Sequence, residues 1–234
     1  MSEQLLYTSK LKIKIICIFT LLLGVTALKA QTQKQWRDSL SAVNSQIAAH
    51  PDSIQLQLQK ANINLQLLEW ENAAQICNEV LKKDTLNLSA LYYRAYANNN
   101  MRRYELAKND YEDFLKISPR NMQARLGLAY TLIKLKRNVQ ALDQMNNLVE
   151  MFPDSSIVYA ARAELEKEMK SYETALYDWD EALKREPGNT DYIISKAEVL
   201  ICLDRKREAK NLLDFLVRNG IARGTLKELY AKCK

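Results

Sequence analysis

The sequence predicts an all-α protein built of stacked helix pairs, and three observations lead to this prediction. Apolar residues recur at helical spacing, as in the stretch 172–183. The same pattern returns every 34 residues from position 54 to position 223 without an insertion. Prolines and helix-capping residues separate successive copies. We therefore expect five copies of one helical hairpin, which we number as the first to fifth repeats: 54–87, 88–121, 122–155, 156–189 and 190–223.

The N-terminal segment 1–30 is of a different kind. Three lysines at positions 10, 12 and 14 precede an apolar run from Ile15 to Leu28, and Ala30 stands before Gln31. This order is typical of a secretory signal peptide, whereas a membrane span needs about 20 apolar residues. We expect a cleaved signal peptide at 1–30 and export, with the bacterial periplasm or cell envelope as the location. An uncleaved anchor is the alternative, and a membrane partner is expected only in that case.

The charge of the chain does not indicate a nucleic-acid partner once the signal peptide is set aside. The full chain has a net charge of +6. Residues 1–30 hold four lysines and one glutamate, so their removal leaves 30 basic and 27 acidic residues and a net charge of +3. A strongly basic surface is the usual mark of a nucleic-acid-binding domain. We therefore expect no nucleic acid.

Half-repeats are expected at both ends of the array. Residues 31–53 contain an amphipathic helix from Trp36 to Ala49 that matches the second helix of a repeat. Residues 224–234 begin one more helix after Gly220, a natural helix C-cap. Terminal repeats must cover the apolar ends of such a stack. Both segments are predicted to be capping helices.

Within the five repeats, three sets of equivalent positions predict the packing. Alanine is invariant at two of them, where the paired helices are expected to cross: Ala61, Ala95, Ala129, Ala163 and Ala197, then Ala73, Ala107, Ala141, Ala175 and Ala209. A core position holds residues of varied size: Cys77, Tyr111, Met145, Trp179 and Leu213. The position before each first helix holds only good N-cap residues: Ser53, Asn87, Asn121, Ser155 and Asn189.

A 34-residue helical hairpin with alanines, a large apolar residue and a proline at these offsets resembles the tetratricopeptide repeat, TPR. The resemblance covers residues 54–223. It implies a right-handed α-solenoid of TPR hairpins with half-repeat caps at both ends, and a concave face that binds peptides or partner proteins. The pentatricopeptide fold, an RNA reader with a period nearer 35, is the alternative.

Few residues suggest catalysis. His50 is the single histidine of the chain, so neither a two-histidine zinc site nor a histidine-based triad is expected. The sequence contains no Gly-rich phosphate loop and no GxSxG motif. We expect no enzyme activity, no cofactor and no metal.

Two arginine–aspartate pairs are expected to be structural. Arg94 and Arg162 are equivalent, and Asp110 and Asp178 follow them at one common interval. The other three repeats lack both residue types at these positions. Since the two positions lie on the facing helices of one repeat, we predict the salt bridges Arg94–Asp110 and Arg162–Asp178.

The TPR resemblance places the first helices along the concave groove, which is the candidate site for a protein or peptide partner. Tyrosine and asparagine dominate its N-terminal half and glutamate its C-terminal half. The predicted partner-binding residues are Asn62, Tyr92, Tyr93, Tyr96, Asn99, Asn100, Tyr130, Glu164 and Glu198. Tyrosine and asparagine provide large contact areas and adaptable hydrogen bonds. The alternative is that the tyrosines pack only between neighbouring helices.

Two further features remain open at this point. Export to an oxidising compartment permits one disulfide, and Cys202 with Cys233 is the plausible pair, while Cys77 should be a buried thiol. The turns between paired helices carry a basic edge that could face anionic lipid or an acidic partner. It consists of Arg102, Arg103, Lys136, Arg137, Lys170, Arg205, Lys206 and Arg207. The sequence thus predicts an exported interaction scaffold, with a membrane-anchored assembly factor or, less favoured, an RNA-binding repeat as alternatives.

Overall fold

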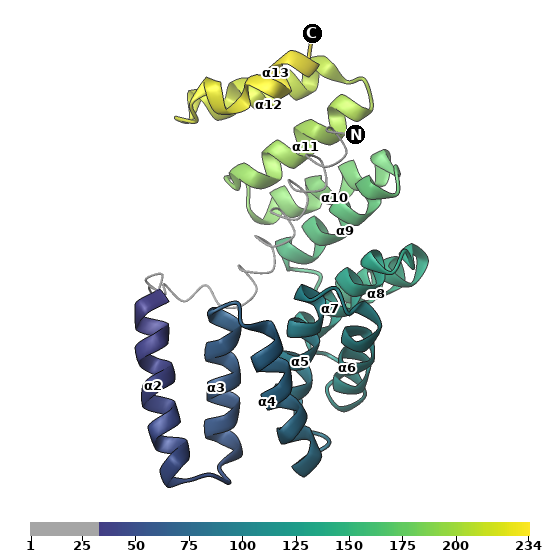
Figure 1. Ribbon diagram of the computed structural model, residues 1–234. Coiled ribbons are helices and arrows are strands. Elements are labelled where there is room, and N and C mark those ends of the chain that lie inside the picture. Colours follow the sequence, from purple (N-terminus) through teal and green to yellow (C-terminus); the bar gives the residue numbers. More distant parts are fainter. Residues whose placement is uncertain (1–32) are drawn as a thin grey trace. The chain divides into compact units, whose positions relative to one another are not determined.

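The computed structural model describes residues 33–234, which consist of helices joined by short turns and contain no strand. The predicted signal peptide at 1–30 lies outside the described residues. The predicted all-α class, with helices paired into hairpins, is confirmed (Figure 1). The helices are α2 (Gln33–Ala49), α3 (Ile54–Gln66), α4 (Trp70–Lys83), α5 (Leu88–Asn100), α6 (Tyr104–Ile117), α7 (Met122–Lys134), α8 (Asn138–Met151), α9 (Ser156–Glu168), α10 (Tyr172–Arg185), α11 (Thr190–Cys202), α12 (Lys206–Arg218), η1 (Arg223–Leu226) and α13 (Lys227–Lys232).

The described chain consists of two compact parts, and the division falls within α8. The N-terminal part comprises residues 33–141 and the C-terminal part residues 142–234. In the N-terminal part, α3 packs against α4 and α5 against α6 as antiparallel pairs, and α4 also packs against α5. In the C-terminal part, α9 pairs with α10 and α11 with α12, and α10 packs against α11.

Four of the five predicted N-cap side chains cap a helix. The side chains of Ser53, Asn87, Asn121 and Asn189 each accept a hydrogen bond from the backbone N–H three residues later, which satisfies one of the open donors of the first turn. Ser155 makes no such bond. The neighbouring Ser156 hydroxyl instead donates to the Glu186 carboxylate, which ties the start of α9 to the end of α10.

The turns between paired helices share one geometry in all five repeats. In the first repeat, the N–H of Glu69 bonds to the carbonyl of Asn64 and the N–H of Leu68 to the carbonyl of Leu65, which is the Schellman arrangement. This arrangement needs a left-handed residue, usually glycine. Here the residues with φ between 58° and 63° are Leu68, Arg102, Lys136, Lys170 and Asp204.

The invariant alanines lie where the paired helices approach each other. All ten are 0% exposed. A larger side chain at these positions would force the two helix backbones apart, because the interior is close-packed. This explains why all five repeats hold alanine at both positions.

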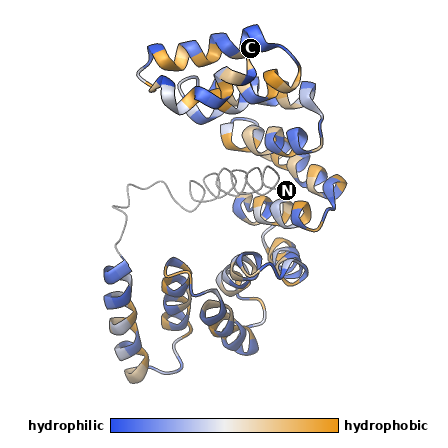
Figure 2. Ribbon diagram, turned by 45° about the horizontal axis from the view of Figure 1, so that its top comes forward, coloured by the Kyte–Doolittle hydropathy of each residue, from blue (hydrophilic) through white to orange (hydrophobic). Residues whose placement is uncertain are grey.

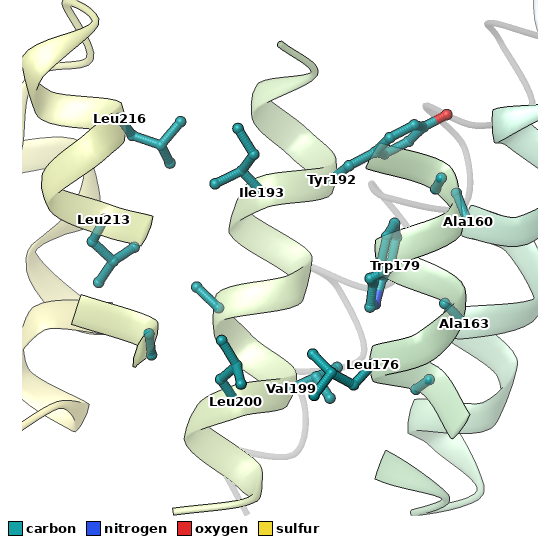
Figure 3. Close-up of a cluster of buried hydrophobic side chains, with 14 of the residues drawn as sticks. Ala160, Ala163, Leu176, Trp179, Tyr192, Ile193, Val199, Leu200, Leu213 and Leu216 are labelled. Atoms are coloured by element: carbon teal, nitrogen blue, oxygen red, sulfur yellow. The ribbon is translucent and has the colours of Figure 1, made fainter. Parts of the chain in front are cut away.

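The core of the C-terminal part is built on Trp179 and the leucines of α12. Trp179 is 1% exposed and contacts the ring of Tyr192 with centroids 5.6 Å apart. Leu213 and Leu216 extend the same cluster toward α11, where Ile193 and Leu200 meet them (Figure 3). This cluster fixes the first helices α9 and α11 relative to each other.

The two terminal segments cover smaller apolar areas. On α2, Val43 is buried, and Trp36, Leu40 and Ile47 pack against Ile63 and Leu67 of the first repeat. At the other end, Leu226 is buried, and Leu229 and Tyr230 pack against the core of the C-terminal part. Hydrophobic and hydrophilic residues occupy different sides of the helices (Figure 2).

One contact between consecutive repeats depends on complementary size. Tyr111 on α6 is fully buried, and its ring fills the space beside Gly127 on α7. A β-carbon on residue 127 would stand 2.5 Å from Cζ of Tyr111. In other repeats, too, one of these two positions holds a larger residue than the other. The residues equivalent to Tyr111 and Gly127, in that order, are Cys77 and Tyr93, Met145 and Ala161, and Trp179 and Ser195.

Candidate interaction surface

In the N-terminal part, the first helices α3, α5 and α7 lie side by side. Contacts join α3 to α5 and α5 to α7. Seven of the nine predicted partner-binding residues belong to these three helices. The other two, Glu164 and Glu198, belong to α9 and α11 of the C-terminal part.

Two tyrosines of α5 form a half-buried aromatic surface with a tryptophan of the first repeat. Tyr96 meets Trp70 edge to face, with centroids 5.9 Å apart, and Tyr93 packs against the same small cluster. Burial raises the pKa of Tyr93 and of Tyr96 above the ordinary value. Both phenols therefore remain protonated at physiological pH and can donate as well as accept a hydrogen bond.

Tyr92 is held more firmly by the scaffold than the other two. Its ring lies edge to face against Tyr111 and Phe114 of α6, with centroids 5.9 and 6.1 Å apart. Burial raises its pKa well above the ordinary range for tyrosine. For Tyr92 the packing role, which the sequence left as an alternative, is the one that the contacts describe.

The asparagines among the predicted partner-binding residues also differ in how firmly the scaffold holds them. Asn99 is 7% exposed, and its amide oxygen accepts the Thr131 hydroxyl at 3.0 Å, which joins α5 to α7. Asn100 is exposed, and its amide nitrogen donates to the Tyr96 carbonyl at 2.9 Å. Asn62 on α3 is half-buried. Asn99 thus belongs to the scaffold, while Asn62 and Asn100 reach the surface.

Tyr130 extends the aromatic surface onto α7. It is half-buried, and the Lys134 ammonium lies 5.1 Å from the centre of its ring. A cation over an aromatic face is attracted by the ring quadrupole, by about 0.5–1 kcal/mol at an exposed site. We call Asn62, Tyr93, Tyr96, Asn100 and Tyr130 the tyrosine–asparagine surface.

In the C-terminal part, the expected acidic character is reduced by a lysine between the two glutamates. Lys167 Nζ lies 2.7 Å from a carboxylate oxygen of Glu164 and 3.3 Å from one of Glu198. Glu164 and Lys167 are buried, and the two carboxylates raise the pKa of Lys167 in spite of that burial. The three groups together carry one net negative charge rather than two.

The two predicted arginine–aspartate pairs are present, and each has a third member that the sequence reading missed. Arg94 donates to both oxygens of Asp110, at 2.9 and 2.6 Å, and Arg162 to both oxygens of Asp178, at 2.6 and 2.7 Å. The remaining guanidinium nitrogens donate to Asn78 at 2.8 Å and to Asn146 at 3.0 Å, on the second helix of the preceding repeat. The hydrogen bonds to Asp178 raise the pKa of Arg162. Each asparagine precedes its arginine by the interval at which the aspartate follows, and this regularity could have identified both.

The basic edge of the turns is partly neutralised by a series of regularly spaced ion pairs between consecutive repeats. Arg103 pairs with Glu71 at 2.9 Å, Arg137 with Glu105 at 2.7 Å, and Arg205 lies 4.0 Å from Glu173. An equivalent pair with the charges exchanged joins Arg37 to Glu69 at 2.7 Å. The edge is therefore less basic than the sequence suggests.

The predicted disulfide between Cys202 and Cys233 is not formed. Both are free thiols in the structure, as is Cys77. Cys202 is exposed at the end of α11, while Cys233 is half-buried and near Lys206, Lys210 and Asp214 of α12. The last turn of the chain thus directs Cys233 toward α12.

Other kinds of site find little support among the described residues. No cluster of three or more His, Cys, Asp or Glu side chains that could hold a metal ion occurs between residues 33 and 234. Over the same range, no helix combines the length and apolar character needed to span a bilayer. Two clefts of about 550 and 330 Å³ in the N-terminal part are lined by other residues than the tyrosines.

Comparison with known proteins agrees with the repeated helical hairpins described above. A family model described as tetratricopeptide repeat matches residues 101–165. The crystal structure of a tetratricopeptide repeat protein from Parabacteroides merdae shares 21% identity and a TM-score of 0.65, over 86% of this chain and 78% of that one. YrrB, described as a TPR protein with an unusual peptide-binding site, shares 19% identity and a TM-score of 0.58, over 74% of this chain and 89% of its own.

The chain is also similar to part of a longer curated protein. The DnaJ homolog subfamily C member 7 homolog of Dictyostelium discoideum is 21% identical over 64% of this chain. The chain covers 37% of the length of that relative. The predicted bacterial origin fits the bacterial source of the Parabacteroides structure. The chain therefore shares the helical-hairpin fold of the tetratricopeptide-repeat structures, and the tetratricopeptide-repeat family model matches one part of it, residues 101–165.

Proposed function

We propose that this protein is a non-enzymatic scaffold whose tyrosine–asparagine surface binds a peptide segment or a partner protein. The observation that carries the proposal is the grouping of Tyr93, Tyr96 and Asn100 on α5 with Tyr130 on α7, each partly exposed. Their backbones are fixed by contacts from α3 to α5 and from α5 to α7. A rigid surface of this kind loses little entropy when a partner binds.

The chemistry of the surface favours an uncharged segment as the partner. Its five members are amides and phenols, and the ammonium of Lys134 already faces the Tyr130 ring. Tyrosine contributes a large contact area with few rotatable bonds, and asparagine bonds both backbone groups of an extended peptide. YrrB, a TPR protein with an unusual peptide-binding site, is similar in fold, and this likeness supports the proposal without identifying a ligand.

The test is crosslinking and recovery of partners with the wild type and with the double variant Tyr96→Ala/Tyr130→Ala. We expect the variant to lose specific partners. Tyr177→Ala is the matched control, because Tyr177 is a 60% exposed tyrosine on α10, outside the first helices. Circular dichroism establishes that all variants are folded. Equal recovery of every partner by the wild type and the double variant would exclude the proposed surface.

We also propose that the protein acts after export, in the periplasm or cell envelope. The proposal rests on the order of lysines, apolar run and Ala30 at the N-terminus. N-terminal sequencing of the protein from the producing cells tests it. A mature chain that starts at Gln31 supports export with cleavage, and an intact N-terminus in the membrane fraction supports the anchored alternative.

RNA binding is the less favoured alternative. The glutamates that face Arg103 and Arg137 reduce the number of free cations on the turn edge. A protein that contacts several phosphates loses affinity steeply as salt rises. Filter binding with single-stranded RNA at low and at high salt distinguishes the two functions, since we expect no retained RNA in either condition.

A further inference from the structure

A buried glutamate on α9 occupies a position that holds uncharged residues in the other four repeats. Glu166 is 9% exposed. The equivalent residues are buried to at least the same degree, and they are Asn64, Asn98, Leu132 and Leu200. A carboxylate loses its hydration at such a place and requires a hydrogen-bond donor or a counter-ion in exchange. One oxygen of Glu166, Oε2, is buried with no hydrogen-bond partner.

The second repeat shows what this position does when the residue is an amide. Asn98 lies beside the Arg94–Asp110 pair, and its amide donates a hydrogen bond to Asp110. In the fourth repeat the same pair is Arg162–Asp178, and Glu166 takes the place of the asparagine. A carboxylate can only accept hydrogen bonds, whereas a protonated carboxyl can donate one.

The groups around Glu166 leave it without a counter-ion of its own. From its own helix, Arg162 faces it, but the guanidinium donates to both oxygens of Asp178 and to Asn146 of α8. From α10, Asp178 and the Thr174 hydroxyl face it. Asp178 is 1% exposed. Two buried carboxyl groups thus share one arginine, and in such an arrangement one of the two holds a proton more strongly.

We propose that Glu166 is a pH-sensitive contact between α9 and α10. When protonated, its carboxyl donates a hydrogen bond to Asp178, as the Asn98 amide donates to Asp110. When ionised, it repels the Asp178 carboxylate and weakens the packing of α9 against α10. The proton comes from and returns to solvent.

The direction of the pH effect follows from the burial of Glu166. Burial, and after it the charge of Asp178, raise the pKa of Glu166 from 4.5 to about 7, while Arg162 and the Thr174 hydroxyl oppose the shift. Because the folded protein binds this proton more tightly than the unfolded chain, stability falls as the pH rises from about 4.5 to about 7. Over that range the unfolding equilibrium constant should rise by between ten- and a hundredfold on account of this one group.

The experiment compares wild type with Glu166→Gln. Urea unfolding of the purified protein is followed at pH 5, 6, 7 and 8. We expect the midpoint of the wild type to fall across this range and the midpoint of Glu166→Gln to stay higher at pH 8, because glutamine keeps the donor and has no charge. A carbon-13 NMR titration of the Glu166 carboxyl gives the midpoint directly, and we expect it near pH 7.

A matched substitution in the second repeat tests the same chemistry at a second place. Asn98→Glu puts a carboxyl beside Asp110 and should add a fall in stability over the same pH range. The proposal is overturned if the pH dependence of the wild type persists unchanged in Glu166→Gln, or if the Glu166 carboxyl titrates near pH 4.5.

Discussion

The ring of Tyr111 stands where a β-carbon on residue 127 would have to be. The distances from that position to Cζ, Cε1 and the hydroxyl oxygen of Tyr111 are 2.5, 2.7 and 2.8 Å. Because Tyr111 is 0% exposed, its ring has no free space to move into. Glycine at position 127 is therefore required by a neighbour in the preceding repeat and not by the helix that contains it.

The first prediction is that Gly127→Ala destabilises the protein in spite of the higher helix propensity of alanine. Overpacking of a close-packed core costs about 1–3 kcal/mol, more than the roughly 1 kcal/mol that alanine gains in a helix. Urea unfolding measures the difference. In a Tyr111→Cys background, which copies Cys77 of the first repeat, the added methyl group should cost much less. An equal cost in both backgrounds would contradict the assigned contact.

The second prediction concerns the Arg94–Asp110 pair. Asp110→Ala leaves a guanidinium without its carboxylate at a site where Asp110 is 5% exposed, and this should cost about 3 kcal/mol. Replacing both residues, as Arg94→Leu/Asp110→Gln, copies Leu128 and Gln144 of the third repeat and should restore most of the loss. Thermal unfolding of the wild type and the two variants measures the loss of stability and its recovery. A double variant that is less stable than Asp110→Ala would show that the pair stabilises the fold by itself.

The third prediction concerns the left-handed turn residues. Lys136 has φ of 63° and is exposed, so its side chain contributes little packing to offset the strain. Lys136→Gly should stabilise the protein by about 0.5–1 kcal/mol, the strain of a left-handed residue less the extra entropy of glycine in the unfolded chain. Lys136→Ala serves as the control and should be close to neutral. Urea unfolding of the wild type and of Lys136→Gly measures the difference, and a lower free energy of unfolding for Lys136→Gly would contradict the prediction.

The fourth prediction concerns thiol reactivity and also tests the disulfide that the sequence suggested. Burial raises the pKa of Cys77 to about 12, so at pH 8 this thiol is both protonated and inaccessible. Cys202 is exposed and should react with a thiol reagent within minutes, while Cys77 should react only after unfolding. Mass spectrometry of the labelled protein identifies the sites. Failure of Cys202 to react before reduction would indicate a disulfide in solution.

The sequence allowed the fold class to be predicted because the copies of the repeat can be compared with each other. An alanine that never varies in five copies reports a close approach of helices, and all ten such alanines are fully buried. The Arg94–Asp110 and Arg162–Asp178 pairs were also within reach, since both members occur together or are both absent. In each of these cases the information lies within one repeat.

Contacts between consecutive repeats were harder to foresee. The pairing of Arg94 with Asn78, and of Arg103 with Glu71, joins side chains of two different repeats, so positions compared within one repeat do not show it. The left-handed turns escaped prediction because none of the five residues concerned is glycine. Tyr92 and Asn99 were assigned to the surface because their spacing places them on the exposed side of α5, but large rings on α6 and a hydroxyl on α7 reach them there.

The size match between Tyr111 and Gly127 also fixes the order in which the repeats can follow one another. Deleting residues 88–121 would keep the period of 34 and every alanine of the remaining copies. It would also bring Cys77 opposite Gly127, and two small residues would face each other where a ring now fills the space. Deleting or duplicating a repeat in this chain therefore changes the packing between hairpins even when the repeat length is kept, because each hairpin fits the side chains of the hairpin that follows it.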